Sequence, residues 1–178
     1  MKKILSIIAV LVWTVAAFAQ EPRLHQRLEL VEIDVDEGDT QLEVFSVPDD
    51  GQNHYFLSVG NLGIGDAIFQ VQFDPLFELF LPLGDTLSDA MDALAQLQDL
   101  FKESPGTGLE LQGCLAVGVP KEDLEPVKVT YRKVLLSRML EFAVERDGYL
   151  RATHIPRSAF NSLVSSLKLY RRIHPNEQ

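Results

Sequence analysis

Apolar and polar side chains alternate along much of the chain from residue 27 onward, which predicts β-strands that have one face in a core. In residues 27–36 the alternation changes phase between Leu30 and Val31, as expected for a strand interrupted by a β-bulge. The nearly continuous apolar run over residues 76–81 predicts a buried strand or a short hydrophobic turn. Further strands are expected over residues 41–47, 54–59, 67–73, 109–119 and 127–131.

The clearest hairpin signal lies near the end of the chain. Apolar and polar residues alternate over residues 140–145 and lead to Asp147-Gly148, a pair that readily adopts the positive φ angles of a tight turn. Residues 149–155 are expected to return as the partner strand.

Two segments have apolar residues at helical spacing. Residues 86–103 carry an apolar stripe, and Thr86 with Asp89 resembles a capping box at the start of a helix. Residues 158–173 carry a second stripe, and Pro175 ends that helix. Both segments therefore predict amphipathic helices that pack on a sheet.

These elements predict an α+β fold class, with a largely antiparallel sheet and two amphipathic helices packed on one face. No linker rich in Pro, Gly or Ser divides residues 20–178, so we expect one domain. Residues 41–103 and 109–174 share the order of a strand hairpin followed by a helix, which raises the possibility of two duplicated strand-hairpin-helix units. Identity between the halves is poor, and this hypothesis depends on element order alone.

The start of the chain is typical of a bacterial secretory signal peptide. Met1 is followed by two lysines, residues 4–15 are apolar, and Ala17 and Ala19 form an A-x-A cleavage pattern before Gln20. The apolar run is shorter than the roughly 20 residues that span a bilayer. We therefore expect cleavage after Ala19, no stable membrane anchor afterwards, and a periplasmic or secreted protein.

Composition limits the partners. The 178 residues include 16 Lys and Arg against 26 Asp and Glu, a formal net charge of −10, so nucleic acid is not an expected partner. Cys114 is the single cysteine, which precludes an intramolecular disulfide, and its apolar neighbours predict a buried free thiol.

The sequence predicts no catalytic residue, metal site or cofactor. The glycines of residues 60–65 lack the order of a nucleotide loop, and the acidic residues 34–39 lack the register of an EF-hand. The four histidines have no metal-binding spacing, although His54 and His154 both lie in expected strands and could meet in space.

One apolar run is a candidate interaction surface, because it is hard to bury fully on both faces of a strand. It comprises Phe77, Leu79, Phe80, Leu81 and Leu83. The alternative is that the helix over residues 86–103 covers this run. The leading hypothesis is an exported, non-enzymatic protein that binds an unknown protein partner. A carrier of a small apolar ligand, held in a pocket between sheet and helices, and an exported hydrolase are the alternatives, and the sequence leaves the oligomeric state open.

Overall fold

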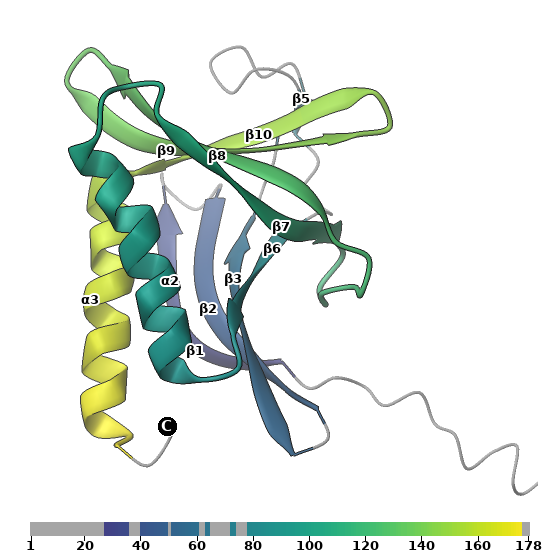
Figure 1. The fold of residues 1–178 in the computed structure, drawn as a ribbon, viewed down its shortest axis with the longest axis vertical. Coiled ribbons are helices and arrows are strands. Elements are labelled where there is room, and N and C mark those ends of the chain that lie inside the picture. The colour runs from purple at the N-terminus through teal and green to yellow at the C-terminus, as the bar shows by residue number, and fades with distance from the viewer. Residues whose placement is uncertain are drawn as a thin grey trace, which may run out of the picture.

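The computed structural model of the chain describes residues 27–35, 40–49, 51–60, 63–64, 72–73 and 78–175. Within them, ten strands form a sheet in which every pairing is antiparallel, and two helices pack against it (Figure 1). The α+β prediction is therefore confirmed. The expected signal peptide and most of the expected strand over residues 67–73 lie outside the described residues.

The sheet has the strand order β1-β2-β3-β6-β7-β8-β9-β10-β4-β5. The bulge predicted after Leu30 is confirmed, because the register of β1 against β2 shifts between Glu29 and Val31. The predicted hairpin at Asp147-Gly148 joins β9 and β10, with φ angles of 56° and 75° at these two residues. The strands are β1 (Leu28–Val35), β2 (Thr40–Asp49), β3 (Gln52–Val59), β4 (Gly63–Ile64), β5 (Gln72–Phe73), β6 (Glu78–Gly84), β7 (Gly108–Ala116), β8 (Glu125–Val134), β9 (Ser137–Arg146) and β10 (Tyr149–Pro156).

Both helices form where the apolar stripes predict them. Helix α2 (Leu87–Asp99) continues into a 3₁₀ turn (Leu100–Lys102), and the Thr86 hydroxyl accepts a hydrogen bond from the Asp89 backbone N–H at 3.1 Å. Helix α3 (Arg157–Ile173) runs antiparallel to α2 beside it (Figure 1). The Thr86 cap satisfies one of the N–H groups that a helix start leaves unpaired.

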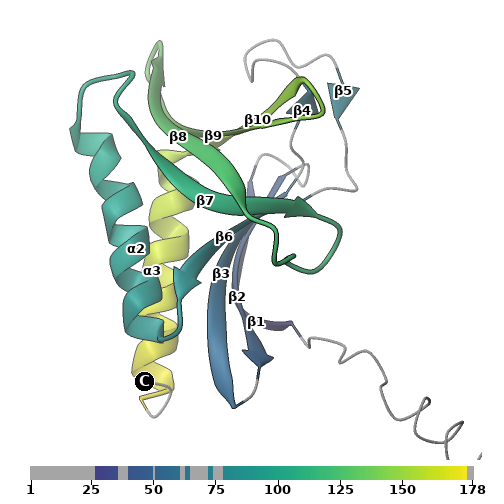
Figure 2. The same ribbon diagram turned by 45° about the vertical axis from the view of Figure 1, so that its right-hand side comes forward.

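Strand β7 belongs to both halves of the sheet. Its last three residues pair with β6, whereas residues 108–113 pair with β8. The half formed by β1, β2, β3 and β6 and the half formed by β8, β9 and β10 run in clearly different directions, and both helices lie on the same side of the first half (Figure 2). The strands thus curl around one side of the helix pair.

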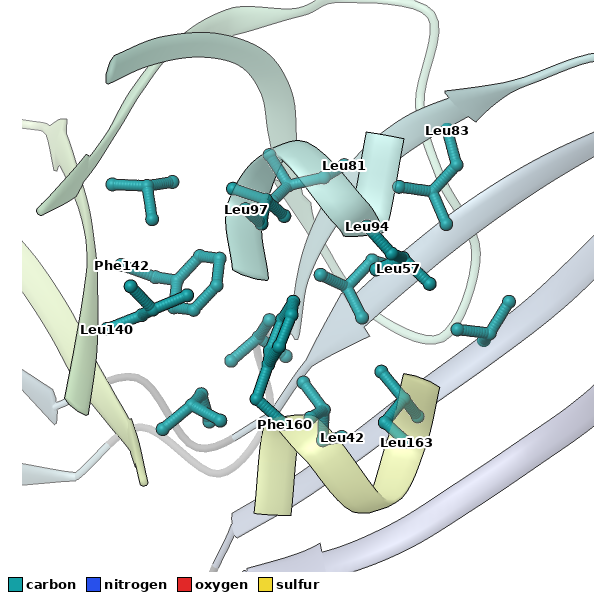
Figure 3. Close-up of a cluster of buried hydrophobic side chains, with 14 of the residues drawn as sticks. Leu42, Leu57, Leu81, Leu83, Leu94, Leu97, Leu140, Phe142, Phe160 and Leu163 are labelled. Carbon is teal, nitrogen blue, oxygen red and sulfur yellow. The ribbon is translucent and has the colours of Figure 1, made fainter. Parts of the chain in front are cut away.

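The main core fills the space between the helices and the two halves of the sheet (Figure 3). Side chains from β2, β3, β6, β9, α2 and α3 meet there, and the largest are fully buried. Phe142 from β9 and Phe160 from α3 contribute the bulkiest rings of the close-up view. Burial of such side chains supplies roughly 1.5–3 kcal/mol each relative to exposure.

A smaller apolar cluster lies on the opposite face of the first half of the sheet. It consists of Phe45, Val47, Phe80, Cys114 and Ala116, with Phe56 packed against it. The connection after β7 lies against this face, because the Lys121 backbone N–H donates to the Cys114 thiol sulfur at 3.2 Å. The predicted burial of Cys114 is confirmed.

The expectation that the apolar run beginning at Phe77 is partly exposed needs correction. Leu79, Leu81 and Leu83 are buried in the main core under α2, and Phe80 is buried in the smaller cluster on the other face. This strand is covered on both faces, so these four side chains do not form a surface. Phe77 lies outside the described residues.

Residues from both halves of the sheet lie close to Gly113, where β7 passes from one half to the other. A Cβ atom at this position would lie 2.8 Å from Leu81 Cδ2, 2.8 Å from the Phe80 carbonyl oxygen and 2.9 Å from Val127 Cγ2. Contacts this short require backbone or core atoms to move. Glycine is therefore the only residue that fits at position 113 without a shift of its neighbours.

We expect Gly113→Ala to lower the free energy of unfolding by about 2 kcal/mol, because the added methyl group overpacks a crossing of two strands. Urea unfolding followed by circular dichroism measures the change. Gly60→Ala is the control, since its new Cβ would meet its nearest neighbour at an ordinary 3.5 Å. Equal stability of the two variants would contradict the role assigned to Gly113.

Candidate functional site

Helix α3 has a second apolar stripe beside its buried one. The buried stripe consists of Phe160, Leu163, Val164 and Leu167. Ser166, Leu169, Tyr170 and Ile173 follow at the i, i+3, i+4, i+7 spacing of a neighbouring face of the same helix, turned toward β1. Leu169 and Ile173 keep 56% and 65% of their surface exposed, whereas Ser166 and Tyr170 are half-buried.

Strand β1 lies at the end of the sheet. Among the described strands only β2 pairs with it, so every second residue of β1 directs its backbone N–H and C=O groups away from the sheet. The bulge turns Leu30 and Val31 toward the helices one after the other, and both contact the main core. The free edge of β1 therefore runs beside the exposed stripe of α3.

An open groove of about 510 Å³ lies along the junction of this edge and the helix. We call it the edge groove, and it is lined by residues 29–32 and Asp34 of β1 and by Ser166, Leu169, Tyr170 and Ile173 of α3. Its volume falls in the range of ligand sites, roughly 300–1,000 Å³. The edge groove has an apolar wall on the helix and a polar rim on the strand.

The rim of the edge groove is acidic. Glu29, Glu32 and Asp34 are exposed, and none of them forms an ion pair with another described residue. Arg171 of the same helix directs its guanidinium to the Met91 sulfur of α2 at 3.5 Å. The rim therefore favours cationic ligands.

Arg27 anchors the start of β1. Its guanidinium donates to the Glu43 carboxylate of β2 through Nε at 3.2 Å and through Nη2, and to Glu78 Oε2 of β6 at 2.8 Å. It also lies 4.2 Å from the ring centroid of Phe45, a cation–π contact over the smaller cluster. One side chain thus ties the edge strand to two strands further into the sheet.

Burial changes the pKa values of both Arg27 and Glu43. Removal from water raises the pKa of the Glu43 carboxyl above its ordinary value, and the hydrogen bonds and charge of Arg27 offset only part of that rise. Burial also acts to lower the pKa of Arg27, but its bonds to Glu43 and Glu78 together outweigh it and raise the pKa. Arg27 therefore holds the pKa of Glu43 below the value that burial alone would give it.

The histidines of the expected strands do not share a site with each other. His54 Nδ1 lies 2.7 Å from Asp85 Oδ1, and His154 Nε2 lies 3.4 Å from Glu141 Oε2 on the other half of the sheet. Among the described residues, no group of three or more His, Cys, Asp or Glu side chains is placed to hold a metal ion. Burial raises the pKa of the Cys114 thiol, which opposes a nucleophilic thiolate.

The second hollow described in the structure is smaller. It measures about 180 Å³ and lies between the β2–β3 pair and the connection after β7, where Val47, Phe56, Val119 and Pro120 contribute its apolar surface. A carrier of a small apolar ligand was expected to hold it in a pocket between the sheet and the helices. Side chains of the main core pack in that space (Figure 3). No helix in the described part of the chain is long and apolar enough to cross a bilayer.

Sequence reasoning missed the edge groove, although one signal was present. Leu169 and Ile173 are apolar residues of the last helix that do not fit its main stripe. Comparison of the chain with known protein families, with curated proteins and with solved structures finds no match.

We expect Arg27→Met to lower the free energy of unfolding by about 2 kcal/mol at neutral pH, because Glu43 stays buried without its partner. Loss of Arg27 raises the pKa of Glu43 further in the folded state. A carboxyl whose folded pKa is raised stabilises the fold when protonated and loses that contribution as the pH rises through this pKa. The loss of stability of Arg27→Met relative to wild type should therefore shrink as the pH falls below the folded-state pKa of Glu43.

Urea unfolding of Arg27→Met and wild type at several pH values between neutral and weakly acid tests this expectation. Lys102→Met is the matched control, since it removes a cation from an exposed ion pair with Asp99 and should change stability by roughly 0.5 kcal/mol or less at every pH. A deficit of Arg27→Met that stays constant across the pH series would argue against Glu43 as its cause.

Proposed function

We propose that the protein is an exported binding protein that captures an extended segment of another polypeptide by adding it as a strand to the edge of β1. The observation that carries the proposal is the position of this free strand edge beside an open groove with an exposed apolar wall. Strand addition uses backbone hydrogen bonds for affinity and side-chain pockets for specificity. An open groove suits a linear ligand better than a compact one.

The two sides of the edge groove define the partner. Successive side chains of an extended segment point to opposite faces, so one set would contact Leu30, Leu169 and Ile173 on the helix side. The other set would lie beside Glu29, Glu32 and Asp34, which follow the opposite face of β1. The expected ligand is a segment in which apolar and basic residues alternate.

Charge supports the same partner at long range. The chain carries a formal net charge of −10, which attracts basic segments and accelerates their encounter at low ionic strength. Export is part of the proposal because the first 19 residues have the pattern of a signal peptide. A partner would then be met outside the cytoplasm.

A fluorescein-labelled octapeptide of alternating valine and lysine should bind the protein, with the change in fluorescence anisotropy as the readout. Two peptides serve as ligand controls, one of the same composition with valines and lysines in separate blocks and one of alternating valine and glutamate. Both should bind more weakly, because the block peptide cannot divide its side chains between the two sides and the acidic peptide is repelled by the rim.

Two variants assign the binding to the edge groove. Glu29→Lys/Glu32→Lys should weaken binding of the alternating peptide by about tenfold, because two attractions become repulsions. Glu110→Lys/Glu145→Lys makes the same change of charge at exposed positions outside the groove and should leave most of the affinity. Leu169→Asp should weaken binding without loss of fold. Equal affinity of wild type and groove variants would refute the proposal.

Export has its own test. The full chain, expressed in a bacterium, should be recovered from the periplasm or the medium with Gln20 as its first residue. Intact-mass spectrometry and N-terminal sequencing measure this directly. Recovery of an uncleaved chain from the cytoplasm would contradict export while leaving peptide capture to be judged by its own experiment.

A further inference from the structure

The hairpin between β8 and β9 exposes apolar side chains at its turn. The turn consists of Val134, Leu135, Leu136 and Ser137, which we call the hairpin tip. Leu135 and Leu136 expose 90% and 96% of their surface, more than any other large apolar side chain described. The packing of the described residues does not explain two adjacent exposed leucines.

The backbone of the hairpin tip is strained at a position where another residue type would remove the strain. Leu135 has φ at +55°, a left-handed conformation that bulky residues rarely adopt and that Gly, Asn or Asp adopts readily. The hairpin between β9 and β10 places Asp147 and Gly148 at such angles. A leucine kept where a turn residue would fold better points to a role for its side chain.

Cations flank the tip. Lys133 and Arg138 lie opposite each other in the register of β8 and β9, and both are exposed. Neither forms an ion pair with a described residue. Arg132 precedes them and donates to Glu141 at 2.8 and 3.1 Å. Glu141 is the one carboxylate in residues 130–141, so this hairpin is basic in a chain that is acidic as a whole.

The hairpin tip and the edge groove lie at opposite ends of the molecule. The hairpin projects at the end where α2 finishes and α3 begins, whereas the groove residues of α3 belong to its C-terminal half (Figures 1 and 2). The 17 residues of α3 span roughly 25 Å at 1.5 Å per residue. A surface bound at the tip would leave the edge groove open.

We propose that the hairpin tip docks the protein on an anionic phospholipid bilayer. Leu135 and Leu136 enter the interfacial region, and Lys133 and Arg138 lie at the level of the headgroup phosphates. The acidic remainder of the chain is repelled from the same surface, so the molecule is held by this end with the edge groove turned away from the lipid. The inference concerns a second surface and does not depend on peptide capture in the groove.

Co-sedimentation with vesicles tests this docking. The full chain is expressed in a bacterium and purified in the form that the cell produces. This protein is then mixed with vesicles rich in phosphatidylglycerol or with vesicles of phosphatidylcholine alone. Wild type should partition more strongly onto the anionic vesicles, and the difference should fall as salt is raised.

Two tip variants separate the apolar and the cationic contributions. Leu135→Gly/Leu136→Asn places turn-forming residues at the tip, so its urea midpoint should be no lower than that of wild type while vesicle binding falls about tenfold. Lys133→Glu/Arg138→Glu should weaken binding by at least about fivefold for each cation removed. Lys168→Glu/Arg172→Glu makes the same change of charge at exposed positions of α3 and should retain binding.

Each other outcome overturns the proposal. Wild type that does not bind anionic vesicles has no such docking site. Binding that survives Leu135→Gly/Leu136→Asn is electrostatic adsorption without insertion of the tip. Binding that falls equally in Lys168→Glu/Arg172→Glu reflects net charge. A dimer in sedimentation equilibrium that the leucine variant dissociates, without binding to vesicles, assigns the tip to a second copy of the chain.

Discussion

The close contact of two groups of strands at Gly113 is the constraint on which the rest of the structure depends. Because β7 pairs with β6 at one end and with β8 at the other, one strand sets the relative direction of both halves of the sheet. That direction decides where the side chains of β9 meet those of α2 and α3 in the main core. A side chain at Gly113 would push these halves apart and open the core between them.

Local patterns predicted local structure well. The phase change at Leu30, the Asp147-Gly148 turn and the stripe of α3 each depend on a few neighbouring residues, and each prediction was confirmed. The turn at Leu135 was not predicted, because a turn made of leucines carries no turn signal and its residues suit a strand or a helix equally. Leucine is an unfavourable residue for the left-handed conformation of this turn, so only the structure shows that the turn lies at Leu135.

The candidate site could not be predicted because it depends on contacts between distant residues. Leu79, Leu81 and Leu83 suited either an interaction surface or a strand covered by the first helix, and the structure shows that they are buried under α2. Conversely, Leu169 and Ile173 were attributed to an ordinary amphipathic helix, although α3 packs with these residues beyond the edge of the sheet. Knowing that β1 is the last strand of the sheet requires its pairing order, and no periodicity within β1 contains that information.

The position of β1 at the sheet edge has a consequence for amide hydrogen exchange. Half of its backbone N–H groups bond to β2, and no described acceptor faces the other half. Residues of β1 should therefore alternate between slow and fast exchange along a single strand. A ligand that adds to the edge slows only the fast set. Protection of these amides therefore measures ligand binding at the edge of β1, residue by residue.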